Sequence, residues 1–144
     1  MTRTLKSQRG VILIEALIGI LIFSIGILAL IGMQAAAMKN TTDARYRSEA
    51  AFLANQIIGQ MWVDRGNLAA YDDGSMTSPL RIQWDADVAA LLPVTAPVAP
   101  ATSNPSILVL AGSGNKVTVT IQWRQPGDPP GNPPRQVQMT NWIN

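Results

Sequence analysis

The first part of the chain contains a long apolar stretch. Residues 11–33 carry one charged side chain, Glu15, among mostly aliphatic residues. An apolar helix of about 20 residues is long enough to span a bilayer. We therefore predict a membrane-spanning helix over residues 11–33, preceded by a basic and polar segment, residues 1–10.

A basic segment followed by an apolar one is typical of an export signal. An ordinary secretory signal has an apolar core of about 7–15 residues and is cleaved after small residues. The three alanines at 35–37 leave open cleavage there, which would release a soluble secreted domain. Arg3, Lys6 and Arg9 precede the span, whereas only Lys39 closely follows it. This asymmetry predicts that the N-terminus lies in the cytoplasm.

A second pattern predicts that the helix continues beyond the apolar stretch. Residues 34–61 contain no proline, and one set of positions recurs every three or four residues, as on an amphipathic helix with one covered face. We predict a helix from about residue 12 to residue 63 that ends at Arg65-Gly66-Asn67. The stripe consists of Met38, Thr42, Tyr46, Ala50, Leu53, Ile57 and Met61.

The second half of the chain differs in composition, because all ten prolines lie at or after Pro79. Residues 71–75 and 78–79 combine aspartate, glycine, serine and proline and are predicted to form loops. Asp72 and Asp73 are expected to be solvated there.

A short helix is predicted over residues 85–92, with Asp85 as its N-cap and Pro93 at its end. Asp85 and Asp87 resemble a pair of metal ligands only superficially, and the capping role is favoured. The proline-rich and alanine-rich residues 93–105 are expected to form an extended connection.

Three strands are predicted after this connection. Residues 107–111 are continuously apolar, and residues 116–124 alternate between apolar and polar side chains. Residues 112–115, Gly-Ser-Gly-Asn, favour a hairpin turn between them. After a proline-rich loop at 125–134, a last strand places Val137, Met139 and Ile143 on one face and Gln136, Gln138 and Thr140 on the other.

One-sided alternation indicates an antiparallel sheet with one covered face. The helical stripe is the expected cover. The sequence therefore predicts an α+β fold in which the outer half of the long helix, residues 34–65, packs on a small sheet in a C-terminal head, residues 66–144. The core of the head is expected to contain the four tryptophans, Trp62, Trp84, Trp123 and Trp142.

Composition excludes several functions. The chain has no histidine and no cysteine, which removes disulfides, thiol catalysis, the common structural zinc sites and the usual general base. The formal net charge of +2 is too small to indicate nucleic-acid binding. We expect a structural protein without enzymatic activity and without a cofactor.

Glu15 is the most informative residue. A carboxylate within an apolar span costs roughly 2.5–3.5 kcal/mol at the bilayer centre, so an intramembrane acid is a functional hypothesis by default. The alternative is that Glu15, only five positions into the stretch, lies among the headgroups and is solvated.

The segment Arg9-Gly10-Val11-Ile12-Leu13-Ile14-Glu15 resembles the processing motif of type IV prepilins. The resemblance implies that a prepilin peptidase cleaves after Gly10, removing residues 1–10, and methylates the new N-terminus on Val11. It also implies that Glu15 is the assembly residue. Val11 departs mildly from the phenylalanine usual in the family. The chemistry is coherent, since a new amine on Val11 and the Glu15 carboxylate of a neighbouring subunit are favoured together in apolar surroundings.

The resemblance extends to minor pilins of the PilV type through residues 24–34 and 47–54, and more weakly through 60–67. Beyond residue 67 it is loose. Two departures are the lack of cysteine, since many pilins have a C-terminal disulfide, and Gly32, which stands where major pilins often have a proline.

This resemblance implies a minor pilin that aids initiation or modification of type IV pilus assembly and contributes to adhesion. It would lie in the bacterial inner membrane as a single-pass protein and later in the pilus at the cell surface. The implied partners are the prepilin peptidase, other minor and major pilins, the inner-membrane assembly platform and membrane lipid. A minor pseudopilin of a type II secretion system remains open, as does a membrane-anchored binding or enzymatic domain.

Small residues also follow one face of the apolar helix. They are Ala16, Gly19, Gly26, Ala29 and Ala36, at spacings of three or seven. Small side chains let helices approach closely in lipid. The face is a candidate for packing between subunits, although glycine and alanine are common in membrane helices in any case.

Overall fold

The computed structural model describes residues 9–93, 104–112, 114–129 and 131–144. The chain divides into two compact units after Thr42. The elements are the helix α1 (Arg9–Val63), the 3₁₀ helix η1 (Arg65–Tyr71), the helix α2 (Pro79–Leu91) and the strands β1 (Ser106–Leu110), β2 (Lys116–Trp123) and β3 (Arg135–Trp142).

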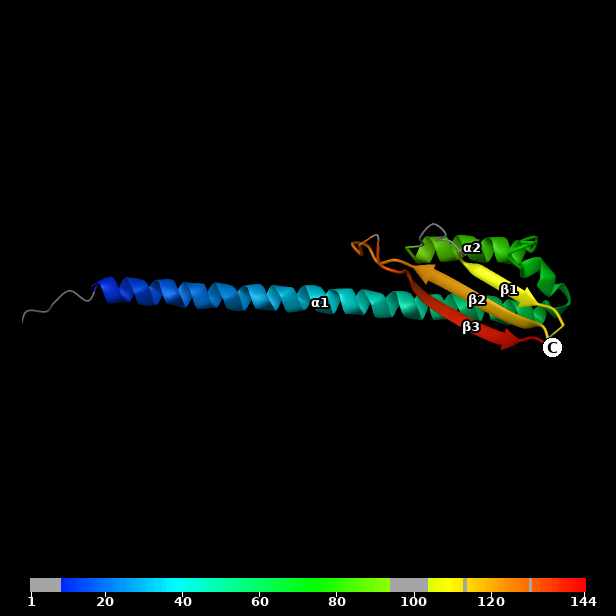
Figure 1. The fold of residues 1–144 in the computed structure, drawn as a ribbon, viewed down its shortest axis with the longest axis horizontal. Helices are drawn as coiled ribbons and strands as arrows, with labels where there is room; N and C mark the ends of the chain where they lie inside the picture. The colour runs from blue at the N-terminus through cyan, green and yellow to red at the C-terminus, as the bar shows by residue number, and fades with distance from the viewer. Residues whose placement is uncertain (1–8, 94–103, 113, 130) are drawn as a thin grey trace, which may run out of the picture. The chain divides into compact units, whose positions relative to one another are not determined.

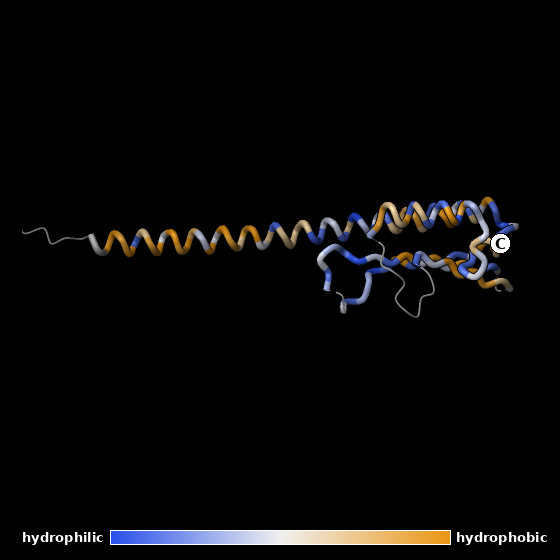
Figure 2. The backbone as a smooth tube through the Cα atoms, turned by 90° about the horizontal axis from the view of Figure 1, so that it is seen from above, coloured by the Kyte–Doolittle hydropathy of each residue, from blue (hydrophilic) through white to orange (hydrophobic). Residues whose placement is uncertain are grey.

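Helix α1 confirms the predicted long helix and its end before Arg65. In the N-terminal unit, every side chain from Val11 to Thr41 is exposed, and the apolar residues are continuous along the helix (Figure 2). The helix is long and apolar enough to cross a membrane. A fully exposed apolar surface of this kind is unfavourable in water.

In the C-terminal unit, α1 supplies six of the 17 buried residues that form the hydrophobic core of the described part of the chain. Ala50, Leu53, Ile57 and Met61 are buried, which confirms the predicted stripe. Ala54 and Ile58 widen the stripe, and Tyr46 packs against the core from its margin. The prediction was wrong for Met38, which belongs to the N-terminal unit and is exposed.

The three strands form one antiparallel sheet in the order β1-β2-β3, as predicted (Figure 1). Alternation along β2 buries Val117, Val119, Ile121 and Trp123 completely. The terminal part of α1 and α2 lie on one side of this sheet (Figure 2). The core of the head therefore lies between two helices and one sheet face, a two-layer α+β arrangement.

The hairpin between β1 and β2 uses backbone conformations that its residues tolerate. Gly112 has φ 101°, Gly114 φ 72° and Asn115 φ 47°, all in the left-handed region. Glycine enters this region without steric cost, and asparagine does so more readily than most residues. Asn115 also accepts a backbone hydrogen bond from Ile143 at 3.2 Å, which holds the C-terminal end of the chain beside the turn.

Helix α2 is longer than predicted and begins earlier. It starts after Ser78 with Pro79 at its first position. Proline is favourable there, because the backbone N–H of the first helical residue has no partner within the helix. The predicted loop at 78–79 was therefore right for Ser78 and wrong for Pro79, and the prediction of Asp85 as N-cap was wrong. Asp85 lies inside the helix and faces Arg81. Most of the connection predicted over 93–105, residues 94–103, lies outside the described residues.

Two of the four tryptophans do not belong to the core. Trp84 and Trp123 are buried, but Trp62 is 44% exposed and Trp142 is 54% exposed. Trp142 is exposed because it occupies an outward position of β3, and Trp62 lies outside the covered stripe of α1.

Candidate functional site

The residues of the prepilin-like motif lie in the first two turns of α1. The helix begins at Arg9, so the bond between Gly10 and Val11 lies in its first turn. Val11 and Glu15 are separated by four residues, or about 6 Å along the axis, and therefore share one face of the helix. The preceding residues 1–8 lie outside the described part of the chain.

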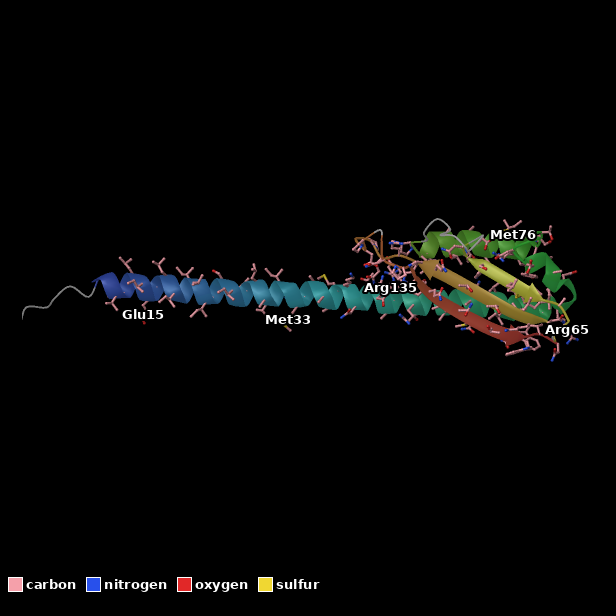
Figure 3. The ribbon with its side chains drawn as sticks, in the orientation of Figure 1. Glu15, Met33, Arg65, Met76 and Arg135 are labelled. Carbon is pink, nitrogen blue, oxygen red and sulfur yellow. The ribbon has the colours of Figure 1, made fainter. Side chains whose placement is uncertain are left out.

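Glu15 is exposed and surrounded by apolar side chains. Val11, Ile12, Ile14 and Ile18 flank it, and each is at least half exposed. The carboxylate points away from the helix (Figure 3) and forms no ion pair within the described residues. A carboxylate in this setting is available to a cation supplied by another molecule. An α-amine is such a cation, and apolar surroundings strengthen the attraction between the two charges.

The small-residue face of α1 is uncovered. Ala16, Ala29 and Ala36 are exposed, and a methyl group added at Gly19 or Gly26 would contact nothing within 4 Å. These glycines are therefore not required for packing within the subunit. Their role in packing between subunits stays a prediction.

The head contains a charged cluster that the sequence did not reveal. The guanidinium of Arg81 is fully buried and donates from Nε to Asp85 at 2.8 Å and from Nη2 to Asp73 at 3.0 Å. It also donates to the carbonyl oxygens of Tyr71 at 2.8 Å and Pro105 at 2.9 Å. The guanidinium carbon of Arg81, Cζ, lies 5.4 Å from the ring centre of Trp84. Arg81 thus joins α2, the η1–α2 connection and the start of β1.

The predicted solvated loop at Asp72 and Asp73 is instead attached to the edge of β1. Asp72 accepts the N–H of Val109 at 2.8 Å, and Asp73 accepts that of Ile107 at 2.9 Å. The N–H of Asp73 donates to the Ile107 carbonyl at 3.0 Å. The two aspartates therefore occupy the hydrogen-bonding groups that a strand beside β1 would use.

Burial sets the protonation behaviour of this cluster. Removal from water raises the pKa of Asp85 above its ordinary value of 3.8, although the hydrogen bond from Arg81 opposes the shift. Burial likewise raises the pKa of Tyr71 above 10.0, and its hydroxyl donates to Asp64 at 3.1 Å. In both groups the pKa is raised because burial disfavours the charged form of the side chain. Asp85 has Arg81 as its partner, and the described residues contain no group of three or more side chains that could hold a metal ion.

A second ion-pair network fixes the beginning of β3. Arg135 pairs through Nε with Asp43 of α1 at 2.6 Å and through Nη1 with Asp128 of the preceding loop. The hydrogen bond that Arg135 donates to the Asp128 carboxylate is the main cause that raises the pKa of Arg135. Asp43 also lies 3.9 Å from Arg47. This network ties the β2–β3 loop to the helix (Figure 3).

Sequence reasoning missed both networks for different reasons. Arg81 and Asp85 have the spacing of a helical ion pair, and that spacing was the available signal. It was overlooked because the helix was predicted to begin at Asp85. The partners Asp73 and Ile107, or Asp43 and Arg135, are distant in sequence, and no local pattern links them.

The chain matches no family model, and neither a curated protein nor a solved structure gives a match.

Proposed function

We propose that this protein is a minor pilin, a structural subunit that aids initiation or modification of type IV pilus assembly. The observation that carries the proposal is Glu15, five residues after Gly10, as a lone acid on an exposed apolar helix that is long enough to cross a membrane. The α+β head on the outer part of the same helix is compatible with a pilin fold.

In the proposed mechanism, a prepilin peptidase hydrolyses the bond between Gly10 and Val11 and methylates the released amine. The amine on Val11 is then a cation at the tip of an apolar helix. Pairing with Glu15 of a neighbouring subunit neutralises both charges. At a separation of 4 Å and an effective dielectric constant of about 20, the attraction is about 4 kcal/mol. The pair thereby sets the axial register between two subunits.

The remaining residues of the apolar unit would contact lipid before assembly and other pilin helices afterwards. Residues 11–33 would cross the inner membrane with the N-terminus in the cytoplasm, as the basic leader predicts. The assembly platform would then transfer the subunit to the fibre. There it would contact other minor and major pilins, and the head would lie at the cell surface, where adhesion occurs.

Mass spectrometry of the full chain tests the proposal. The chain is expressed in a host with and without a prepilin peptidase, and the mass of the product is measured. Cleavage after Gly10 with a methylated Val11 is the expected result, and it requires the peptidase. An intact leader would support a simple membrane anchor, and cleavage after Ala37 would support a secreted domain. Either outcome would contradict the proposal.

A minor pseudopilin of a type II secretion system would share the cleavage and the methylated terminus. The two functions are separated by a deletion of the gene. Loss of surface pili with normal secretion is expected for a minor pilin, whereas loss of secretion with normal pili would assign the chain to the secretion system.

A further inference from the structure

Strand β1 lies at an edge of the sheet, because within the described residues β2 is its only neighbouring strand (Figure 1). The backbone groups on the outer side of an edge strand are a template for a strand of another molecule. On β1 this side is occupied by the segment that joins η1 to α2. The contact combines side-chain carboxylates with one backbone hydrogen bond, so it is not a further strand of the sheet.

Asp72 and Asp73 occupy three backbone groups of β1. Asp72, the C-cap of η1, accepts the N–H of Val109 through Oδ2 at 2.8 Å. Asp73 accepts the N–H of Ile107 through Oδ1 at 2.9 Å, and its own N–H donates to the Ile107 carbonyl at 3.0 Å. Ile107 and Val109 are alternate residues of the strand, so they direct their backbone groups to the same side. An added strand would need these same groups, and it can pair with β1 only after the two aspartates leave.

Both carboxylate oxygens of Asp72 are in use. Oδ2 binds β1, and Oδ1 accepts the N–H of Gly74 at 2.9 Å. The bond to Gly74 forms an Asx turn, which fixes the side chain of Asp72 to its own segment. The carboxylate is therefore held in place to receive the N–H of Val109.

Arg81 holds the second aspartate. Its Nη2 donates to Oδ1 of Asp73 at 3.0 Å, the same oxygen that accepts the N–H of Ile107. The guanidinium also binds Asp85 and the carbonyl of Tyr71, which lies immediately before the two aspartates. Hydrogen bonds between an ionised donor and an ionised acceptor are stronger than neutral ones, and the Arg81 side chain is fully buried. Arg81 thus fixes both the start of the segment and Asp73 itself.

The sequence of β1 explains why its edge needs protection. Residues 106–111, Ser-Ile-Leu-Val-Leu-Ala, contain no charged residue, no proline and no glycine. Segments of about six residues with this composition and high β-propensity stack with copies of themselves when their edge is exposed. Charged side chains and proline are the common protections of an edge strand, and the strand itself has neither. The protecting charges come instead from residues 34 and 37 positions earlier in the chain.

A second copy of β1 is the strand that this edge would fit if it were uncovered. Antiparallel pairing of two copies would place Leu108 opposite Leu108 and Ile107 opposite Val109. The outward backbone groups of Ile107 and Val109 would then exchange hydrogen bonds across the pair. Every opposed pair would be apolar and neutral, and the contact would be symmetric, so the same edge would serve both copies.

We propose that Asp72 and Asp73, held by Arg81, form an edge clasp, an autoinhibitory contact that keeps β1 from pairing with β1 of a second copy. The clasp satisfies the backbone of the edge within the subunit, and it places two carboxylates where the second strand would lie. This inference does not depend on cleavage after Gly10 or on Glu15, so it and the proposed function fail separately.

Amide hydrogen exchange tests whether the clasp closes the edge. It is measured by NMR on the full chain in detergent micelles, at a protein concentration low enough that copies do not pair. In the wild type, the N–H groups of Ile107 and Val109 should exchange slowly although they lie on an edge. Asp72→Ala should accelerate exchange at Val109 at least about tenfold, because a hydrogen bond to a charged acceptor is lost. Rapid exchange at Val109 in the wild type, or unchanged exchange in the variant, would overturn the proposal.

Asp72→Ala is chosen because it leaves the Arg81 cluster in place. None of the four hydrogen bonds that Arg81 donates goes to Asp72. The matched control is Asp87→Ala, which removes the same charge from an aspartate that binds no group of β1 within the described residues. Exchange at Val109 should be the same in this control as in the wild type.

Disulfide formation tests which strand the uncovered edge accepts. Because the chain has no cysteine, Leu108→Cys introduces a single thiol, at a position that is 49% exposed. Directly opposed residues of an antiparallel pair have Cα atoms about 4.5–5.5 Å apart, a separation that a disulfide can bridge. The matched control is Leu110→Cys, on the same strand and 45% exposed. Two copies of residue 110 would lie four residues apart along the pair, or about 13 Å, which is too far for a disulfide.

Both thiol variants are prepared with and without Asp72→Ala, oxidised at high protein concentration in micelles, and analysed for dimers on non-reducing gels. Leu108→Cys should give severalfold more dimer with Asp72→Ala than without it, whereas Leu110→Cys should give little dimer in either case. Equal amounts of dimer from Leu108→Cys with and without Asp72→Ala would contradict the clasp. Equal amounts at positions 108 and 110 would contradict pairing between two copies of β1.

Discussion

At the scale of a single residue, Glu15 places a carboxylate among apolar side chains. It lies among isoleucine and valine side chains and has no cationic partner within the described residues. Without a partner, a charged carboxylate is unfavourable in lipid. The proposed amine of a neighbouring subunit removes that cost only when subunits assemble.

Glu15→Gln should therefore leave processing unchanged and impair assembly. Loss of the charge pair is expected to reduce incorporation into fibres at least about tenfold, since 1.4 kcal/mol corresponds to that factor. Incorporation is measured by immunoblotting of sheared pili, and processing by mass spectrometry. Glu49→Gln serves as the control, because Glu49 lies 3.9 Å from Arg45 on the outer half of the helix. Normal incorporation of the Glu15 variant would contradict its assembly role.

Arg81 shows how one buried charge organises the head. Its guanidinium donates four hydrogen bonds, two to carboxylates and two to backbone carbonyls, in three segments of the chain. Removing one partner of a buried ion pair is costly because the remaining charges lose their compensation.

Arg81→Met should destabilise the head by about 3–5 kcal/mol. Urea unfolding of the full chain in micelles, followed by tryptophan fluorescence, measures the loss. Arg45→Met is the control, because Arg45 is 75% exposed and its ion pair with Glu49 should contribute less than about 1 kcal/mol. Equal stability of the two variants would show that the Arg81 cluster does not support the fold.

The pH dependence of stability should carry a signature of Asp85. Because its pKa is raised in the folded state, native Asp85 binds a proton at a higher pH than unfolded Asp85 does. Lowering the pH through the native pKa toward 3.8 therefore stabilises the folded state through this group. The free energy of unfolding of the wild type, minus that of Asp85→Asn, should increase as the pH falls from 7 to about 4. If this difference in the free energy of unfolding decreased over the interval, the pKa of Asp85 would be lowered in the folded state rather than raised.

At the scale of elements, the single helix α1 has two parts that differ in burial. Its apolar part is uncovered on all sides, whereas its outer part buries one face against the sheet. The outer part retains an exposed face that includes Phe52, at 65% exposure, and Trp62. Burial in the head thus depends on which face of the helix a residue occupies.

Two substitutions on the outer part of α1 should distinguish its buried face from its exposed face by their effects on stability. Ile57→Ala removes a fully buried side chain and should cost about 2–5 kcal/mol. Phe52→Ala, five positions earlier on the exposed face, should change stability by less than about 0.5 kcal/mol. Chemical unfolding of the head measures both. Similar losses for the two variants would contradict the described orientation of the helix.

At the scale of the whole molecule, the subunit leaves much of its apolar surface for contacts with other molecules. Gly19 and Gly26 illustrate this, since both have open space around them in the single subunit. A larger side chain at either position would not disturb the subunit but would keep a neighbouring helix at a greater distance.

Gly26→Leu should therefore preserve membrane insertion and cleavage and reduce incorporation into fibres severalfold. Ser24→Leu is the matched control, because residue 24 lies about 160° around the helix from residue 26. Quantification of the subunit in sheared pili and in membranes checks both variants. If the two variants were incorporated equally well, the small-residue face would have no role in assembly.

The sequence alone determined the elements whose signals are local. The apolar stretch, the stripe on the outer helix and the alternation along β2 predicted the long helix, the antiparallel sheet and the faces that the outer helix and the sheet bury. These predictions succeeded because apolar periodicity acts over a few turns of helix or a few residues of strand.

Only the tertiary structure decided how distant segments are joined. It placed Arg81 among Asp73, Asp85 and the carbonyl of Pro105, and it showed that Asp72 and Asp73 bind the backbone of β1. Hydrogen bonds and ion pairs between residues far apart in sequence leave no periodic pattern, because each depends on where the folded backbone brings the two groups together. For that reason the buried cluster and the aspartates at the edge of β1 became visible only in three dimensions.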